Sequence, residues 1–419
     1  MLSSRKRVLS SAPTDGSNPR LKGAYSSGGT QKHEKSESIN RRSSRISFLS
    51  IATISVAVAA SYLVLNRQES VSSVWTATKV IPRHRFVTVV IPSVVNHPRR
   101  HRRVEAIADT WAETARALIV VHNLTQEYPT ASQEIIWNEK QEPVDKNRYP
   151  QVLHLPQNIT MQDDDGFKRL EYVIRHVYYQ QKAEFIFLVN DHSYVIPEHL
   201  CHYLKPFEPD VDLYSGHAMR NPSVVFNTGA AGYLMSRETM KRLLKVWDEG
   251  KQCQAELSFH RSNPDLVVSG CLQDVLHVPA VDTRESGTYH RFHTYGLVRT
   301  VMGKVDDWFV NVHDRFQNIP GFDESYRKLL SGADCCAGDS SSFHYVEYAE
   351  TRALFEIRQL LLQDPEMTDS QLRKLLEQKW PRSDLGGYSL ALPLSDADTM
   401  KNFMVVIRKM SRTDLEVHC

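Results

Sequence analysis

Residues 185–195 read Phe-Ile-Phe-Leu-Val-Asn-Asp-His-Ser-Tyr-Val, an apolar run that breaks off into Asn190, Asp191 and His192. Such a run predicts a central strand that is buried on both faces and carries polar side chains at its carboxyl end. In open α/β sheets, ligands bind at this edge. The residues alone leave a second interpretation open, in which the strand ends in an ordinary Asx-type turn.

The rest of the chain supplies the elements that would surround this strand. It has 419 residues, of which 41% are hydrophobic, and this is enough for a sizeable core. The net charge of +2 gives no indication of nucleic-acid binding. Apolar runs predict further strands at residues 86–92, 117–122, 152–154 and 211–214. Helical spacing predicts helices that end near Trp111, begin near Phe167, Pro197, Ser236 and Asp265, and cover residues 345–363.

The N-terminal region predicts a membrane anchor. Residues 46–65 contain no charged residue, and twenty residues in a helix span a hydrocarbon core. The preceding tail is basic, so the positive-inside rule places it in the cytosol. The alternative is a buried core helix. We expect a tail, an anchor, a stem, a luminal domain and a C-terminal extension over residues 1–45, 46–65, 66–85, 86–363 and 364–419.

The cysteines and the glycosylation sequons agree with a luminal domain. All six cysteines follow the expected anchor, in a compartment where disulfides persist. Asn123 and Asn158 begin Asn-X-Thr sequons on the same side. Cys335 and Cys336 are adjacent, and we expect at least one of them to pair elsewhere.

Two charged runs invite functional interpretations that the sequence context does not favour. Residues 99–103 (Arg-Arg-His-Arg-Arg) would suit an acidic partner or a protease, but we interpret them as the solvated face of a helix. Residues 163–165 (Asp-Asp-Asp) look like a metal motif, but they directly precede a helical pattern, where acids complement the helix dipole. Asp191 at the end of the strand is the better metal candidate.

Two further segments carry open alternatives. Residues 227–236 include Gly229 and Gly232. Either these glycines let the backbone come close to a ligand or another strand, or they belong to a tightly packed turn. Asp265 lies in the first turn of a predicted helix, where it is either a functional carboxylate or a helix cap.

Six segments in this order resemble the core 1 β1,3-galactosyltransferases, relatives of Fringe among the inverting glycosyltransferases. The most specific of them combines Cys335-Cys336 with a Ser-Phe-His-Tyr-Val element at residues 342–346. The matching segments are Thr110-Trp111, residues 190–195, residues 228–233, residues 264–272, residues 292–294 and residues 335–346. The resemblance covers residues 86–360 and implies an α/β domain of the GT-A type, with a Rossmann-like nucleotide-sugar fold, behind the anchor.

The resemblance also implies roles for individual residues. Asp265 matches the catalytic base that takes the proton of the acceptor hydroxyl. Positions His192 and His293 match protein ligands of manganese, which sits on the UDP diphosphate. The resemblance implies that Asn190, Asp191, Gly229 and Gly232 contact the UDP-sugar. It implies that Asp191 also contacts the metal. Cys253 and Cys271 resemble a disulfide that brackets the segment of the base.

The implied reaction is inverting transfer of galactose from UDP-galactose to the 3-hydroxyl of an acceptor, such as protein-linked N-acetylgalactosamine. The implied location is the Golgi or endoplasmic reticulum membrane, and a homodimer is left open. Two family carboxylates are replaced here by Asn190 and His192, and imidazole should lower the affinity for a hard cation. The alternatives are therefore a silent relative that acts as a chaperone for an active transferase, and a Fringe-like β1,3-N-acetylglucosaminyltransferase.

Overall fold

The computed structural model describes residues 85–93, 99–121, 150–161, 165–222, 224–250, 253, 263–382 and 389–411. The expected tail and anchor, nearly all of the stem, and the sequon at Asn123 lie outside these ranges. Within them, no helix is both long enough and apolar enough to cross a membrane. All described residues belong to one compact unit, Val80–Cys419.

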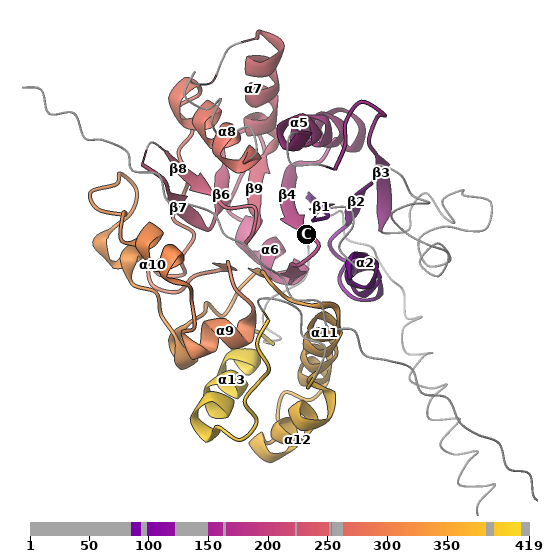
Figure 1. The fold of residues 1–419 in the computed structure, drawn as a ribbon, viewed down its shortest axis with the longest axis vertical. Helices are drawn as coiled ribbons and strands as arrows, with labels where there is room; N and C mark the ends of the chain where they lie inside the picture. The colour runs from indigo at the N-terminus through magenta and orange to yellow at the C-terminus, as the bar shows by residue number, and fades with distance from the viewer. Residues whose placement is uncertain are drawn as a thin grey trace, which may run out of the picture. The chain divides into compact units, whose positions relative to one another are not determined.

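The main sheet has six strands in the order β3-β2-β1-β4-β9-β6. Their bounds are β3 Gln151–His154, β2 Leu118–Val121, β1 Phe86–Ile91, β4 Phe185–Asn190, β9 Tyr233–Ser236 and β6 Tyr214–Gly216. Strands β3, β2, β1 and β4 are parallel, whereas β9 is antiparallel to both β4 and β6. The expected central strand is confirmed, because β4 lies between β1 and β9 (Figure 1).

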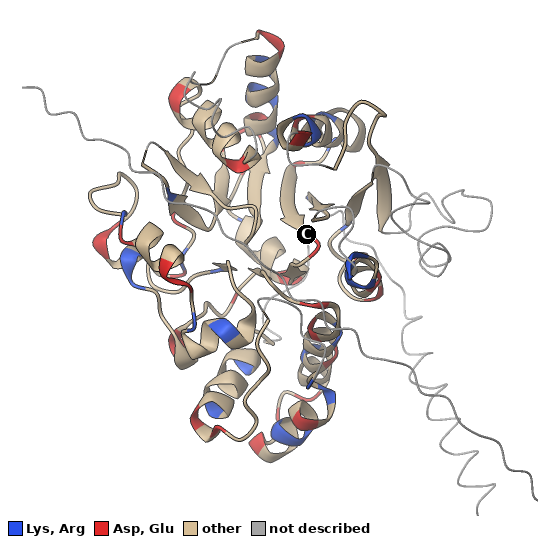
Figure 2. Ribbon diagram, in the orientation of Figure 1, with Lys and Arg blue, Asp and Glu red and all other residues tan. Residues whose placement is uncertain are grey.

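Helices cover both faces of this sheet. The structure has α2 Arg100–Asp109, α5 Gly166–His176, α6 Pro197–Leu204, α7 Arg237–Asp248, α8 Pro264–Gly270, α9 Leu297–Met302, α10 Asp307–His313, α11 Tyr348–Gln363, α12 Asp369–Lys379 and α13 Ala397–Lys409. Short π-helices follow α5 and α8 at Val177–Gln181 and Cys271–Val275, and 3-10 turns lie at Glu324–Arg327 and Gly332–Asp334. In Figure 2 the charged residues lie mainly on helices and loops, and the strands of the six-stranded sheet carry none.

Alternate residues of β4 enter two different hydrophobic cores. Phe185, Phe187 and Val189 pack with residues of α2, α6 and α11. Ile186 and Leu188 pack on the other face with residues of α5, α7 and α8. A strand that buries side chains on both faces needs an uninterrupted apolar sequence, which explains the run at residues 185–189.

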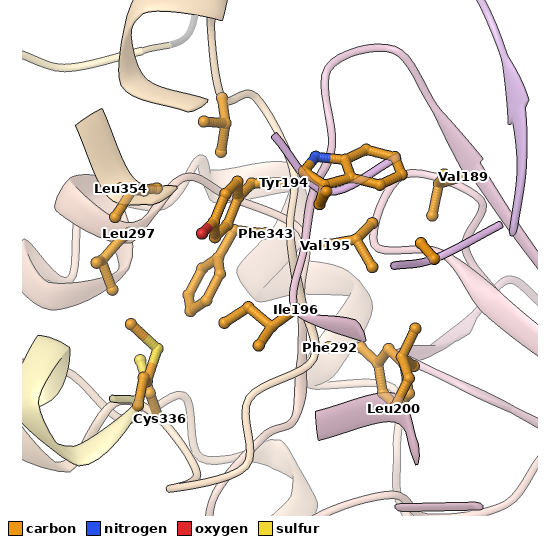
Figure 3. Close-up of a cluster of buried hydrophobic side chains, with 14 of the residues drawn as sticks. Val189, Tyr194, Val195, Ile196, Leu200, Phe292, Leu297, Cys336, Phe343 and Leu354 are labelled. Atoms are coloured by element: carbon orange, nitrogen blue, oxygen red, sulfur yellow. The ribbon is translucent and has the colours of Figure 1, made fainter. Parts of the chain in front are cut away.

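Two smaller sheets complete the fold. Strands β10 Phe292–His293, β11 Ser342–Phe343 and β5 Tyr194–Val195 form one, and β7 Ala218–Arg220 pairs with β8 Val225–Asn227 in the other. Figure 3 shows side chains of all three strands of the first sheet, among them Tyr194 and Phe343, beside Leu297 of α9 and Leu354 of α11. The first small sheet therefore belongs to the same core as β4.

Helices α12 and α13 also belong to this core, although the C-terminal sequence carries no motif. Leu372 and Leu376 of α12 and Phe403 of α13 are fully buried in the same cluster as Phe187. Lys409 at the end of α13 donates a hydrogen bond to the carbonyl of Cys336 (2.7 Å). The residues beyond 364 that the structure describes thus help to hold the Cys335-Cys336 segment in place.

Three expectations are corrected. Of the basic run, Arg100 and Arg103 are 1% exposed rather than solvated, because α2 turns them inward and Arg103 meets buried carboxylates. Cys335 and Cys336 are bonded to each other, and Cys201 is also disulfide-bonded. The strand expected at 211–214 begins only at Tyr214, since Val211 is 61% exposed.

Candidate active site

Asn190 ends β4 and organises the turn that follows it. Its side-chain oxygen accepts hydrogen bonds from the backbone N–H of His192 (2.9 Å) and from the hydroxyl of Ser193 (3.2 Å). This is the Asx-type geometry that the residues alone allowed. Its amide nitrogen donates to Nε2 of His344 (2.8 Å), so the turn is also tied to the segment after β11.

Asp191 is buried and already has partners for both of its oxygens. Arg103 Nε lies 2.9 Å from Oδ2, and the backbone N–H of Ser93 donates to Oδ1 (2.8 Å). Burial alone would raise the pKa of Asp191, but the charges of Arg103 and His192 and these hydrogen bonds hold it below its ordinary value. This carboxylate therefore anchors Arg103, and its contact with a metal or nucleotide stays a prediction.

A second buried carboxylate, Glu347, lies near the same arginine. Its Oε1 lies 3.6 Å from Arg103 Nη1 and 3.7 Å from His192 Nδ1. Its Oε2 is buried and has no hydrogen-bond partner among the described residues. Glu347 is the N-cap of α11, and it lies two residues after Tyr345, whose backbone is left-handed (φ 56°). The sequence reasoning missed Glu347, although an acid directly after the Ser-Phe-His-Tyr-Val element was a signal.

His192 remains partly exposed at the mouth of this group. The side chain is 17% exposed, and its ring lies 6.0 Å from that of His344 and 6.3 Å from that of Tyr345. His192 is therefore exposed enough to meet a ligand while its Nδ1 lies 3.7 Å from Oε1 of the buried Glu347.

The structure does not bring His293 to His192. The ring of His293 stacks on Phe343 at 4.4 Å, and its Nε2 lies 3.0 Å from the hydroxyl of Ser340. Consecutive residues of an extended chain point to opposite faces, so His344 turns the other way from Phe343 and reaches Asn190. The geometry thus favours His344 over His293 as the second histidine beside the motif. The metal-binding role of His293 stays a prediction, without support from its contacts.

No group of three or more His, Cys, Asp or Glu side chains in the described part of the chain is arranged to hold a metal ion. Two side chains could together hold a divalent cation: His192, through one imidazole nitrogen, and Glu347, whose Oε2 has no hydrogen-bond partner among the described residues. Manganese accepts oxygen and imidazole ligands, and phosphate oxygens of a substrate would complete such a two-residue site. The residues present therefore fit a divalent cation bound together with its substrate.

Asp265 lies in the first turn of α8, but it does not cap the helix. Asn263 is the N-cap, and its side chain accepts from the backbone N–H of Asp265 (3.2 Å). The carboxylate of Asp265 instead accepts from the N–H of Gly229 (2.7 Å) and interacts with the Tyr233 hydroxyl. Burial raises the pKa of Asp265 to about 6, although both hydrogen bonds lower it. A carboxylate with this pKa suits a general base near neutral pH.

Both glycines of residues 228–232 lie so close to a neighbouring group that a side chain would not fit. A Cβ on Gly229 would lie 2.9 Å from Oδ2 of Asp265. Gly232 has φ +83°, and a Cβ there would lie 2.6 Å from Phe187 of β4. The same segment reaches the end of β4, because the carbonyl oxygen of Ala230 lies 3.5 Å from the hydroxyl oxygen of Ser193. These glycines thus let one loop touch both Asp265 and the strand.

The structure also describes the predicted disulfide, the last residue of the acidic run and one of the two sequons. Cys253 and Cys271 form the expected disulfide. Asp165 directly precedes α5, and Lys168 and Thr160 hold its pKa well below its ordinary value. Asn158 is exposed, as a glycosylation acceptor requires.

Comparison with known proteins relates part of this chain to a described family and to a curated transferase. Residues 95–300 match the model of a family described as Fringe-like. The chain is also similar to glycoprotein-N-acetylgalactosamine 3-beta-galactosyltransferase 1 of Xenopus laevis, with 25% identity over 177 residues. That similarity covers 41% of this chain and 44% of the relative, so the chain spans less than half the length of the curated relative it matches. The predicted resemblance is confirmed: residues 95–300 are Fringe-like, and a core 1 β1,3-galactosyltransferase is among the proteins to which the chain is similar.

Proposed function

We propose that this chain is an inverting glycosyltransferase that moves galactose from UDP-galactose to the 3-hydroxyl of an acceptor sugar, such as protein-linked N-acetylgalactosamine. The observation that carries the proposal is Asp265, a carboxylate whose pKa is raised to about 6 and whose position is fixed by the N–H of Gly229. The name of the Xenopus relative supports the choice of donor and acceptor.

The reaction needs one base and one way to stabilise the leaving group. Asp265 takes the proton of the acceptor hydroxyl while its oxygen attacks C1 of the donor sugar. The C1–oxygen bond to UDP breaks on the opposite face, which inverts the configuration at C1. A divalent cation held by His192 and Glu347 would offset the charge that develops on UDP. Asp191 and Glu347 hold Arg103 beside this position.

The experiment is a transfer assay on the purified full-length protein with and without manganese. We expect a β1,3-linked disaccharide from UDP-galactose and an N-acetylgalactosamine glycoside, and a lower rate after chelation. UDP-N-acetylglucosamine serves as the second donor, since a Fringe-like transferase would use it instead. If neither donor gives a product or is hydrolysed, the proposal fails.

A silent relative is the second candidate, and one observation favours it. The position of the family's last motif carboxylate holds His192, and the remaining Asp191 already pairs with Arg103. A chaperone of this kind would bind UDP with the same affinity at every manganese concentration. An active enzyme should bind UDP more tightly as manganese is added, and His192→Ala should remove that gain.

We also propose a location, which follows from residues 46–65 and the basic tail before them. The protein would sit in the Golgi or endoplasmic reticulum membrane as a single-pass type II protein, with the catalytic domain in the lumen. Its partners would be UDP-galactose and a glycoprotein acceptor, and a homodimer is left to measurement.

A further inference from the structure

A cavity of about 330 Å³ is lined by none of the residues that take part in the chemistry above. Its wall comes from β10, α9, α10 and the segment before Cys335. In Figure 1, α10 is drawn beside β7, and the two elements are in contact. Pockets of this volume are at the small end of those that hold organic ligands.

Three buried histidines line the cavity, namely His217, His290 and His293. No carboxylate is among its lining residues. The guanidinium in its wall, Arg327, lies near Glu324 and Asp314, so its charge is already balanced and does not favour an anionic ligand.

One of these histidines has a nitrogen without a partner. His217 Nδ1 lies 2.8 Å from the carbonyl of Phe292, and its Nε2 lies 2.9 Å from Nε2 of His313. His290 packs against His217 at 4.8 Å and is 5% exposed, yet no described residue forms a hydrogen bond with its Nε2. A buried polar atom without a partner is costly, and a ligand hydroxyl would satisfy it.

The rest of the wall supplies the apolar surface that a sugar ring needs. Tyr295 and Phe309 meet edge to face, with ring centroids 5.2 Å apart, and both line the cavity. Aromatic rings combined with uncharged hydrogen-bonding groups fit a neutral, hydroxyl-rich ligand better than a nucleotide diphosphate.

The cavity adjoins the site at two points. Leu266, the neighbour of Asp265, packs in one hydrophobic cluster with Tyr295 and Phe309. On the other side, the backbone N–H of His344 donates to the carbonyl of His293 (3.0 Å). The wall of the cavity is therefore joined by packing to the helix that carries Asp265, and by a backbone hydrogen bond to the segment that reaches Asn190.

We propose that this cavity is the subsite for a neutral sugar ring of the acceptor, with His290 as a hydrogen-bonding group. The assignment to the acceptor rests on the proposed function. The binding of a neutral sugar at His290 does not, because it follows from the wall of the cavity alone.

The test measures binding of methyl α-N-acetylgalactosaminide to the full-length protein by saturation-transfer NMR and calorimetry. His290→Phe keeps a ring but removes the nitrogen, and we expect about tenfold weaker binding. His290→Gln, which keeps hydrogen-bonding atoms, should stay within about threefold of the wild type. His154→Phe, at an exposed position of β3, is the control and should bind normally.

Activity then separates the two proposals. In the His290→Phe variant we expect a raised acceptor KM, with unchanged hydrolysis of UDP-galactose and unchanged UDP affinity. Unchanged glycoside affinity and KM in this variant would overturn the subsite while leaving the enzyme proposal intact. Glycoside binding that depends on His290, in a protein that neither hydrolyses nor transfers, would support the cavity and refute the enzyme. If His290→Phe does not fold, Val310→Trp fills the cavity from a position that is 37% exposed and should have the same effects.

Discussion

At the scale of single residues, the site depends on buried charged side chains, each of which lies beside a side chain of opposite charge. Arg103 links Asp191 and Glu347, and its guanidinium is almost completely buried. Removing one partner of a buried ion pair costs much more than removing a surface charge. This difference makes Arg103 testable without any assumption about activity.

We expect Arg103→Met to lower the free energy of unfolding by about 3–5 kcal/mol, because it leaves Asp191 buried without its counter-charge. The control is Arg102→Met, one residue away on the exposed side of α2, which should cost less than about 1 kcal/mol. Denaturant unfolding of both variants is the measurement. Equal effects would mean that the buried pair does not stabilise the fold.

Asp265 predicts a pH dependence with a definite sign. As a base it must be ionised, so the transfer rate should rise through a pKa of about 6 and then level off. The folded-state pKa lies above the unfolded value, so the contribution of this group to stability is complete below about pH 4 and is lost as the pH rises through 6. Asp265→Asn should therefore be more stable than the wild type at pH 8 by about 1–3 kcal/mol, but not at pH 4. Thermal unfolding at both pH values checks this, and a stability difference that does not change with pH would contradict it.

At the scale of elements, β4 and the loop at residues 228–232 determine where the side chains meet. Gly232 packs against Phe187 of β4 in a left-handed conformation. Gly250 has a similar φ of +64°, but no described atom lies within 4 Å of the position that a Cβ would take there. Comparing alanine substitutions at Gly232 and Gly250 therefore separates the cost of backbone strain from the cost of steric crowding.

Gly250→Ala should cost about 1 kcal/mol, which is the strain of a left-handed backbone for alanine. Gly232→Ala should cost clearly more, at least about 2–3 kcal/mol, since its Cβ would also displace Phe187 from the core. Chemical denaturation gives both values. A cost for Gly232→Ala no larger than that for Gly250→Ala would show that the loop can move away from β4.

The sequence predicted the elements well where their signals are local. The apolar run at 185–189 identified β4, and the helical spacing that begins near Ser236 identified α7, whose N-cap Ser236 accepts a hydrogen bond from the N–H of Thr239. The contacts of Glu347, His344 and Arg103 could not be predicted, because they join segments more than eighty residues apart. Arg103 was misinterpreted for the same reason: a basic run on a helix is usually solvated, and only the tertiary fold places two carboxylates beside it.

At the scale of the whole molecule, the described residues form one unit in which the C-terminal helices complete the core. No sequence motif indicates that α12 and α13 belong to the core, because their buried residues have only the ordinary spacing of amphipathic helices. The membrane topology depends on residues 46–65, which lie outside the described part.

We expect the full-length protein in microsomes to leave its N-terminal tail open to protease and its C-terminal domain protected. The control adds detergent, which should expose the whole chain. Glycosidase sensitivity at Asn158 should accompany protection of the domain. Protection of the tail with exposure of the domain would reverse the topology that the basic tail predicts.

The central claim is that Asp265 is the base of a glycosyl transfer, and the transfer rate of Asp265→Asn tests it most directly. The matched control is Asn263→Ala, which removes the cap of the same helix and should lower stability by about 0.5–2 kcal/mol while keeping turnover. We predict that Asp265→Asn loses about 10²–10⁴-fold in transfer from UDP-galactose, with UDP affinity unchanged. Wild-type turnover in the folded Asp265→Asn variant would contradict the account.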